Sequence, residues 1–389
     1  MSRRILFISH SAARTGAPIG LLAFMRWVVE NTDYKISTIL KSTGPLESEF
    51  RELGPCLVLR TNSIFNNRIG RKIAKALPQS LTSQYRAVHS FLQGKNIDVI
   101  YSNTSTNGEL LTELAKYGIP VLTHVHELSY WITQAGEKNW NETKKASSYY
   151  VAASHAVRDY IVEEKGIPSE QVSVVYEHIR ELPEIPTPEK RQKARNELGI
   201  SDEVILIGGC GSEYWRKGKD LIPQLLIELR KLRPDISFHF LWLGSNWSDH
   251  DEYTLSYDLK TAGFSSHFHN PGEVKDPFSL YAALDSFALL SRDDPYPLAC
   301  LEVAAMQIPI VCFENSGGIP ELTHRDAGLT APYLDMAAFA QSLIKLTEST
   351  ELRERITKNA RINVDQESTL EATAPKLLEA LEDAAKLDN

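Results

Sequence analysis

Short apolar runs rich in β-branched residues alternate with longer amphipathic segments along the whole 389-residue sequence. This alternation is typical of parallel strands joined by crossover helices, because such strands are buried on both faces and such helices on one. We predict two series of strands, separated by a charged stretch rich in proline. The first series is 5–9, 35–40, 99–102, 121–124, 149–153 and 172–176, and the second is 204–208, 237–243, 267–269, 286–290 and 308–313.

The length is too great for one ordinary hydrophobic core and suits two domains of under 200 residues each. Residues 180–197 contain three prolines and many charges, so we expect a linker there. The prediction is therefore an α/β protein with two Rossmann-like domains. The tail is expected to form one or two amphipathic helices interrupted at Pro375 and to pack on the first domain. The expected boundaries are 1–182 for the first domain, 183–197 for the linker, 198–365 for the second domain and 366–389 for the tail.

Composition excludes several classes of protein. Hydrophobic residues at 42% and charged residues at 24% are ordinary values for a globular chain. No run of about 18 apolar residues is present, and the apolar run near the N-terminus is too short for a signal peptide. The cysteines lack the spacing of a zinc site or a disulfide framework, which suits a reducing cytoplasm. We therefore expect a cytoplasmic protein without a metal. The four cysteines are Cys56, Cys210, Cys300 and Cys312.

One segment carries a local excess of positive charge. Residues 53–97 contain no Asp or Glu but seven Lys or Arg. Within it, 66–77 (NNRIGRKIAKAL) places Ile69 and Ile73 on one face among basic residues, as in an interfacial helix, with a solvated basic helix as the alternative. Peripheral contact of 60–95 with the inner face of the membrane is therefore a hypothesis. Nucleic-acid binding is not expected, because few aromatic residues are interleaved with the charges.

Glycine-rich or small polar sequences follow several predicted strands, and in open parallel sheets ligands bind at that edge. In 205–211 (ILIGGCG), glycines would let a phosphate approach the backbone, and Arg216 and Lys217 follow to neutralise its charge. The alternative for the basic pair is a solvated helix start. Gly16 and Ala17 lie between the first strand and an apolar helix, so free amides there would face an anion. Their spacing fits neither a dinucleotide fingerprint nor a Walker loop.

The most specific pattern is Ser291–Glu302 (SRDDPYPLACLE), which combines a strand end, an acidic pair and a helix starting near Pro297. The first amides of that helix, from Leu298 and Ala299, would be unpaired donors. Glu302 lies one to two turns inside the helix among apolar neighbours, so its carboxylate needs a polar partner. Ribose hydroxyls are such a partner.

Asp294 to Glu302 resembles the motif of an acid, seven residues and Glu in the retaining glycosyltransferases of family 4. Gly317–Glu321 (GGIPE) is similar to the GGxPE segment that follows this motif in many members. The resemblance implies the GT-B fold, in which two Rossmann-like domains face each other across a cleft. Further similarities cover most of the chain: Lys217-Gly218, Asn270–Val274 with Ala283–Asp285, and Ala153–Val157.

The resemblance also implies an activity, in which a sugar moves from a nucleoside-diphosphate sugar to a hydroxyl of a glycan or lipid-linked acceptor, with retention of configuration. Polysaccharide or glycoconjugate biosynthesis would be the setting, with no metal and no cofactor besides the donor. The displacement would take place on one face of the sugar, since no carboxylate pair suits a double displacement. The implied roles are Glu302 for ribose, Leu298 and Ala299 beside Pro297 for the diphosphate, Asp294 for the sugar, Arg216 and Lys217 for the leaving group, Val274 for the base, His126 for the sugar site, and Gly16 with Ala17 for phosphate and acceptor.

Several residues depart from the family pattern. Asp294 stands where Glu is usual, Pro297 replaces a frequent Gly, and Ser212 replaces a frequent Arg for which Arg216 would substitute. His126 also has a simpler interpretation as a hydrogen-bonded histidine at a strand end. Two other functions therefore stay open: a nucleotide-sugar epimerase of the same fold, and a non-catalytic relative that binds a nucleotide.

Overall fold

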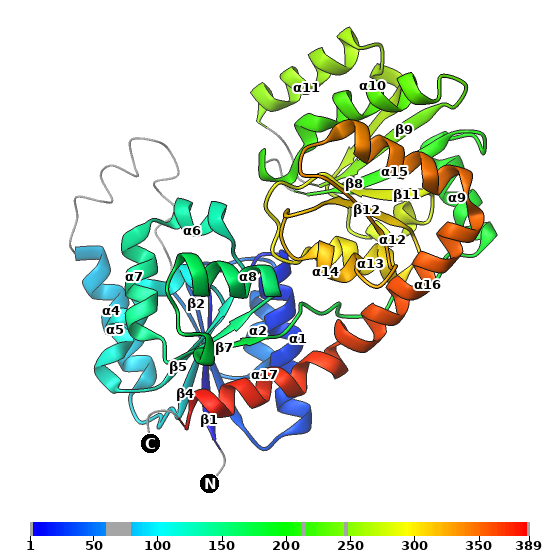
Figure 1. Cartoon of the computed structure of the whole chain (residues 1–389). Helices are drawn as coiled ribbons and strands as arrows, with labels where there is room; N and C mark the ends of the chain where they lie inside the picture. Colours follow the sequence, from blue (N-terminus) through cyan, green and yellow to red (C-terminus); the bar gives the residue numbers. More distant parts are fainter. Residues whose placement is uncertain (1–2, 60–78, 212–214, 245–247, 387–389) are drawn as a thin grey trace. The chain divides into compact units, whose positions relative to one another are not determined.

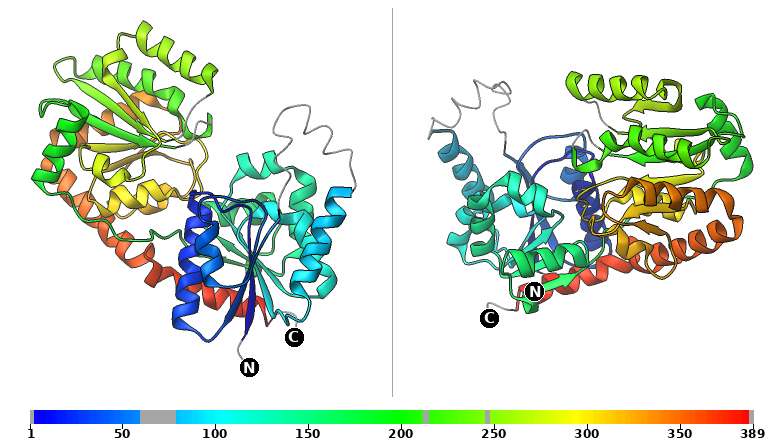
Figure 2. Two further views of the ribbon diagram at one scale, coloured as in Figure 1. Left: turned by 180° about the vertical axis from the view of Figure 1, so that it is seen from behind. Right: turned by 45° about the horizontal axis from the view of Figure 1, so that its top comes forward.

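The computed structural model describes residues 3–59, 79–211, 215–244 and 248–386, without the side chains of 79–83. The chain forms two compact units, the first made of Met1–Ala153, Val157–Val175 and Thr373–Asn389, and the second of Ser154–Ala156 and Tyr176–Ala372. Each unit is a parallel sheet with helices on both faces, seen from three directions in Figures 1 and 2. The predicted two-domain α/β fold is confirmed.

The sheet of the first unit has the strand order β3-β2-β1-β4-β5-β6-β7, with every described pairing parallel. The chain winds outward from β1 in one direction and from β4 in the other, so the carboxyl ends of β1 and β4 flank the point where ligands usually bind. The strands are β1 (Arg4–Ser9), β2 (Lys35–Leu40), β3 (Cys56–Val58), β4 (Val99–Ser102), β5 (Val121–Val125), β6 (Tyr149–Ala152) and β7 (Val172–Val174).

Helices cover both faces of this sheet. Phe24 of helix α1 packs edge-on against Phe7, with ring centroids 6.1 Å apart, while α4 and α5 cover the opposite face around Leu6. The C-terminal helix α17 belongs to the same unit, and its Glu382 accepts a hydrogen bond from the Tyr34 hydroxyl at 2.5 Å. The helices are α1 (Gly16–Asn31), α2 (Glu47–Leu53), α4 (Gln79–Leu92), α5 (Gly108–Leu114), α6 (Ser129–Ala135), α7 (Glu137–Ala146), α8 (His155–Asp159) and α17 (Leu370–Ala384).

The second unit repeats this plan, with the strand order β10-β9-β8-β11-β12-β13 and a reversal between β8 and β11. Its strands are β8 (Ile205–Cys210), β9 (Phe238–Leu243), β10 (Phe268–Gly272), β11 (Ser286–Leu289), β12 (Ile310–Phe313) and β13 (Leu329–Ala331). Its helices are α9 (Pro188–Leu198), α10 (Ile222–Leu232), α11 (Asp249–Thr261), α12 (Pro277–Tyr281), α13 (Leu298–Ala305), α14 (Ile319–Thr323), α15 (Met336–Glu348) and α16 (Thr350–Glu367).

Much of the expected linker 183–197 is helical, which corrects the prediction of an irregular segment. Helix α9 begins after Thr187, whose Oγ1 accepts a hydrogen bond from the Lys190 amide at 3.3 Å. Pro188 occupies the first turn, where its missing N–H costs nothing, and Gly199 ends the helix in the left-handed region. These start and stop signals outweigh the charge density.

Other details differ from the prediction. The edge strands β3 and β13, of three residues each, are absent from the predicted series. Helix α17 continues through Pro375 instead of breaking there. The basic helix predicted for 66–77 and Ser212 lie outside the described residues. In the described parts of the chain, no helix is both long enough and apolar enough to cross a bilayer.

Candidate active site

The two motifs of the second unit are joined through their backbones. Asp294 and Gly317 form an isolated parallel bridge, in which the Asp294 amide donates to Ser316 O at 2.8 Å and the Gly318 amide donates to Asp294 O at 3.0 Å. Gly317 has a φ of 123°, and a Cβ there would lie 1.8 Å from Asp294 O. Only glycine fits this position, so the GGIPE segment holds the backbone of the acidic motif in place.

Asp294 is the centre of a buried ion cluster. Its Oδ1 accepts from Arg216 Nη1 at 3.1 Å, and its Oδ2 accepts from Lys217 Nζ at 2.6 Å and from Ser291 Oγ at 2.8 Å. Burial raises the pKa of this carboxyl. The positive charges of Lys217 and Arg216 lower it by a larger amount, so the net pKa lies below the ordinary value. The structure thus brings three of the four expected catalytic residues together, through a direct contact that the sequence did not predict.

Glycines at the end of β8 serve packing as well as backbone access. A Cβ on Gly208 would lie 2.3 Å from Leu284 Cδ1, and one on Gly209 would lie 2.9 Å from Phe240 Cε1. These two glycines therefore also make room for neighbouring side chains, and the approach of a phosphate to the backbone here stays a prediction. A Cβ on Gly211 would lie 2.7 Å from Cγ of Lys217, so this glycine lets the lysine cross the strand end toward Asp294.

Helix α13 begins without a side-chain cap, because Pro297 at the N-cap offers no acceptor. The amides of Leu298 and Ala299 are its first two, and both residues pack, together with Val274, on one hydrophobic cluster. Uncapped amides and the helix dipole favour an anion at this end. Glu302 follows on the same helix, where burial raises its pKa to about 7. The second unit therefore gathers the residues expected to bind a nucleotide.

In the first unit, Asn103 connects two expected site residues. Its Nδ2 donates to Ala17 O at 2.8 Å, at the start of α1 next to Gly16, and its Oδ1 lies 3.0 Å from His126 Nε2. Because the amide oxygen is an acceptor, His126 carries its proton on Nε2 in this contact. Sequence reasoning missed Asn103, although it directly follows a predicted strand, which is the position where polar residues reach a ligand.

Glu127 completes this polar group. It is buried, and its carboxylate accepts from the Thr104 hydroxyl and from the amides of Ser105 and His126, each amide at 3.1 Å. The His124 ring lies 3.8 Å from that of His126 between centroids. Together these residues form a row of polar side chains along the carboxyl edge of the first sheet.

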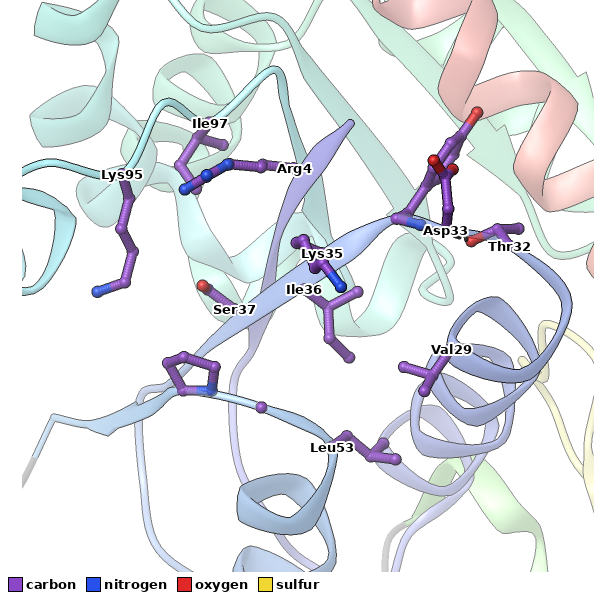
Figure 3. Close-up of a pocket in the computed structure, with 13 residues that line it drawn as sticks. Arg4, Val29, Thr32, Asp33, Lys35, Ile36, Ser37, Leu53, Lys95 and Ile97 are labelled. Atoms are coloured by element: carbon purple, nitrogen blue, oxygen red, sulfur yellow. Dashed lines mark hydrogen bonds between the residues drawn. The ribbon is translucent and has the colours of Figure 1, made fainter. Parts of the chain in front are cut away.

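A hollow of about 380 Å³ lies at the opposite edge of this sheet (Figure 3). It is lined by the amino ends of β1 and β2, with Arg4 and Lys95 on one side of β2 and Val29 and Leu53 on the other. Among its lining residues there is no residue of the predicted site. The cavity is therefore separate from the carboxyl-edge row.

Comparison with known proteins places the chain in a family. A profile described as Glycosyl transferases group 1 matches residues 190–363, and one described as Glycosyltransferase Family 4 matches residues 50–180. The crystal structure of Anabaena HepE in complex with UDP and glucose has a TM-score of 0.77 at 19% identity, over 97% of this chain and 99% of that one. The two units thus define the GT-B fold. The chain belongs to the family 4 glycosyltransferases.

Curated relatives match parts of the chain. Alpha-galactosylglucosyldiacylglycerol synthase of Streptococcus pneumoniae is 28% identical over 154 residues, 38% of either protein. D-inositol 3-phosphate glycosyltransferase of Paenarthrobacter aurescens is 25% identical over 254 residues, 62% of this chain and 59% of the relative. Each alignment thus covers less than two thirds of the relative's length.

Proposed function

We propose that this protein transfers a sugar from a nucleoside-diphosphate sugar to a hydroxyl of a glycan or lipid-linked acceptor, with retention of configuration. The observation that carries the proposal is the arrangement of α13, which has uncapped amides at its start and the partly buried Glu302 one turn further on. The buried cluster of Asp294, Arg216 and Lys217 lies just before this helix. The UDP and glucose in the HepE crystal structure and the glycolipid synthase among the relatives support it.

The donor would bind to the second unit. Glu302, when ionised, accepts hydrogen bonds from the two ribose hydroxyls, and the backbone near Val274 contacts the base. The amides of Leu298 and Ala299 bind the diphosphate, since a helix N-terminus favours negative charge. Arg216 and Lys217 stabilise the charge that develops on the diphosphate as it leaves, which is the main source of rate enhancement expected for such a reaction.

Sugar transfer would then need positioning rather than a protein nucleophile. The bond from the anomeric carbon to the diphosphate oxygen breaks, and the acceptor oxygen bonds to that carbon on the same face. The acceptor proton passes to the departing phosphate. Asp294 binds a sugar hydroxyl and keeps Lys217 in place, while His126, oriented by Asn103, contacts the sugar. No cofactor takes part besides the donor.

Thermal unfolding with UDP-, GDP- and ADP-sugars tests the proposal, because a donor that binds the folded state raises the midpoint. Glu302→Ala should abolish this rise, whereas Glu354→Ala, an exposed change on α16, should keep it. Proton NMR of the reaction with the stabilising donor should then show release of the nucleoside diphosphate. Conversion of the donor into its epimer without release would identify an epimerase. A chain stabilised by no donor would refute the proposal.

A further inference from the structure

Two basic residues directly follow neighbouring strands of the first sheet and have no role in the transfer described above. Ser9 of β1 pairs with Leu40 of β2, so His10 and Lys41 come next on each strand. The Lys41 amide donates to Ser9 O at 2.9 Å, which keeps the two strand ends together. Since the sheet order is β2-β1-β4-β5, Lys41 and His10 extend the polar row that continues with Asn103 and His126.

The Lys41 ammonium is half-buried and has few partners. Its Nζ donates to Thr106 O at 2.8 Å, and no carboxylate of the described residues lies within 4.0 Å of it. Burial lowers the pKa of Lys41, and attraction to the Glu109 carboxylate offsets this only in part. An ammonium has three N–H donors, so two of them stay available to a ligand.

His10 has an unsatisfied polar atom at the same place. Its Nδ1 is buried and has no hydrogen-bond partner among the described residues. Burial lowers the pKa of His10, Glu127 opposes this, and His126 and Lys41 lower it further. The oxygens of Glu127 already accept three hydrogen bonds from Thr104, Ser105 and His126. A buried polar atom without a partner is unfavourable, and a ligand at this edge would supply the missing hydrogen bond.

We propose that Lys41 and His10 bind a phosphate group of the acceptor, so that the acceptor is a phosphate ester. The Lys41 ammonium pairs with the phosphate charge, and His10 donates to a second phosphate oxygen. The loop that follows His10 leads into helix α1. The uncapped amides of Gly16 and Ala17 at the start of this helix supply positive potential. The identification of the occupant as the acceptor rests on the proposed glycosyl transfer. The phosphate comes from a small polyol or sugar phosphate, or from a lipid headgroup.

Calorimetry on the full chain with excess UDP tests this site apart from the donor site. Inorganic phosphate and glycerol 3-phosphate serve as soluble probes, and vesicles with phosphatidylglycerol are compared with phosphatidylcholine vesicles. We expect saturable binding either of the soluble phosphate probes or of the phosphatidylglycerol vesicles. Lys41→Met should weaken it at least tenfold, Lys41→Arg should keep it within about threefold, and Lys116→Gln, an exposed change on the same unit, should leave it unchanged.

Two results would overturn the site: no saturable binding in either arm, or equal binding by Lys41→Met and Lys116→Gln. The UDP affinity and thermal midpoint of Lys41→Met must match those of the unaltered chain, which shows that the variant is folded. If UDP fails to bind at all, the proposed function fails while the phosphate titration still reports on Lys41. When UDP does not occupy the start of α13, phosphate could bind there instead. Such binding would not change in Lys41→Met, and that result would count against the proposed site at Lys41 and His10.

Discussion

Lys217 Nζ lies 2.6 Å from Oδ2 of Asp294, and this ion pair is buried at the centre of the second unit's polar cluster. Arg216 contacts the other carboxylate oxygen at 3.1 Å. One carboxylate therefore positions both cations that we assign to the leaving diphosphate. The expected division of roles, in which Asp294 serves only the sugar, becomes a coupled arrangement in which the carboxylate also positions the cations.

Asp294→Asn should be strongly destabilising. The amide leaves the buried Arg216 and Lys217 without a counter-charge, and breaking such a buried pair costs about 3–5 kcal/mol. Urea unfolding measures the loss. Asp365→Asn removes an exposed partner of Arg361 and should cost at most about 1 kcal/mol. Similar losses for the two variants would contradict the buried-cluster account.

Glu302→Gln should stabilise the protein at high pH. Burial raises the pKa of Glu302 to about 7, whereas the unfolded chain has the ordinary value near 4.5. The unfolded state therefore loses this proton first, and the free energy of unfolding falls as the pH rises from about 4.5 to about 7. The neutral glutamine avoids this loss, so the advantage of Glu302→Gln at pH 8 should be about 3 kcal/mol and should vanish at pH 4. Urea unfolding at pH 4 and pH 8 measures the free energy of unfolding of Glu302→Gln and of the unaltered chain, with Glu354→Gln as control. A gain at pH 8 no larger than at pH 4 would refute the burial effect.

Asn103→Ala should loosen the first unit's site. The Ala17 carbonyl and His126 Nε2 each lose the hydrogen bond to Asn103, at a cost of about 1–3 kcal/mol to the free energy of unfolding. Asn31→Ala removes an exposed amide bonded to Trp27 O and should cost less. Long-range proton–nitrogen NMR should also show a larger share of the Nδ1-protonated form of His126. An unchanged His126 tautomer would mean that Asn103 does not set it.

Gly317→Ala should disrupt the junction between the two motifs. Its Cβ would overlap Asp294 O, whereas a Cβ on Gly94, whose φ is also positive, would meet no atom within 4 Å. Gly94→Ala should therefore cost only the backbone strain of about 1 kcal/mol, and Gly317→Ala should cost clearly more. Urea unfolding compares the two. Equal costs would show that the bridge to Asp294 is not tightly constrained.

The alternation of apolar and amphipathic segments predicts both sheets, because parallel strands buried on both faces leave a strong local signal. Strands β3 and β13 were not predicted, whereas β7, also a three-residue edge strand, lies within the longer apolar run 172–176 that was. Helix α9 was not predicted, because its high density of charged residues suggested a linker, although Thr187, Pro188 and Gly199 mark its ends. Local pattern therefore predicts the core elements better than the edges.

The candidate site divides in a similar way. Glu302 and the amides of Leu298 and Ala299 are predictable because the acid, the proline and the helix lie within one stretch of sequence. The contact of Asp294 with Lys217 joins residues 77 positions apart, and the contact of Asn103 with His126 joins residues 23 apart. Such contacts depend on strand order, which sequence periodicity does not specify. Lys41 and His10 became visible as neighbours only through the register of β1 and β2.

Calorimetric titration with UDP at pH 8, where Glu302 is mostly ionised, tests the central claim most directly. If this chain is a nucleotide-sugar glycosyltransferase that uses UDP and Glu302 binds the ribose, the full chain should bind UDP. Glu302→Ala should then weaken binding about 30- to 150-fold, since hydrogen bonds to a charged group contribute about 2–3 kcal/mol. Glu354→Ala should leave the affinity unchanged. Equal UDP affinity of Glu302→Ala and the unaltered chain, or no binding of UDP, GDP or ADP by the unaltered chain, would contradict the account.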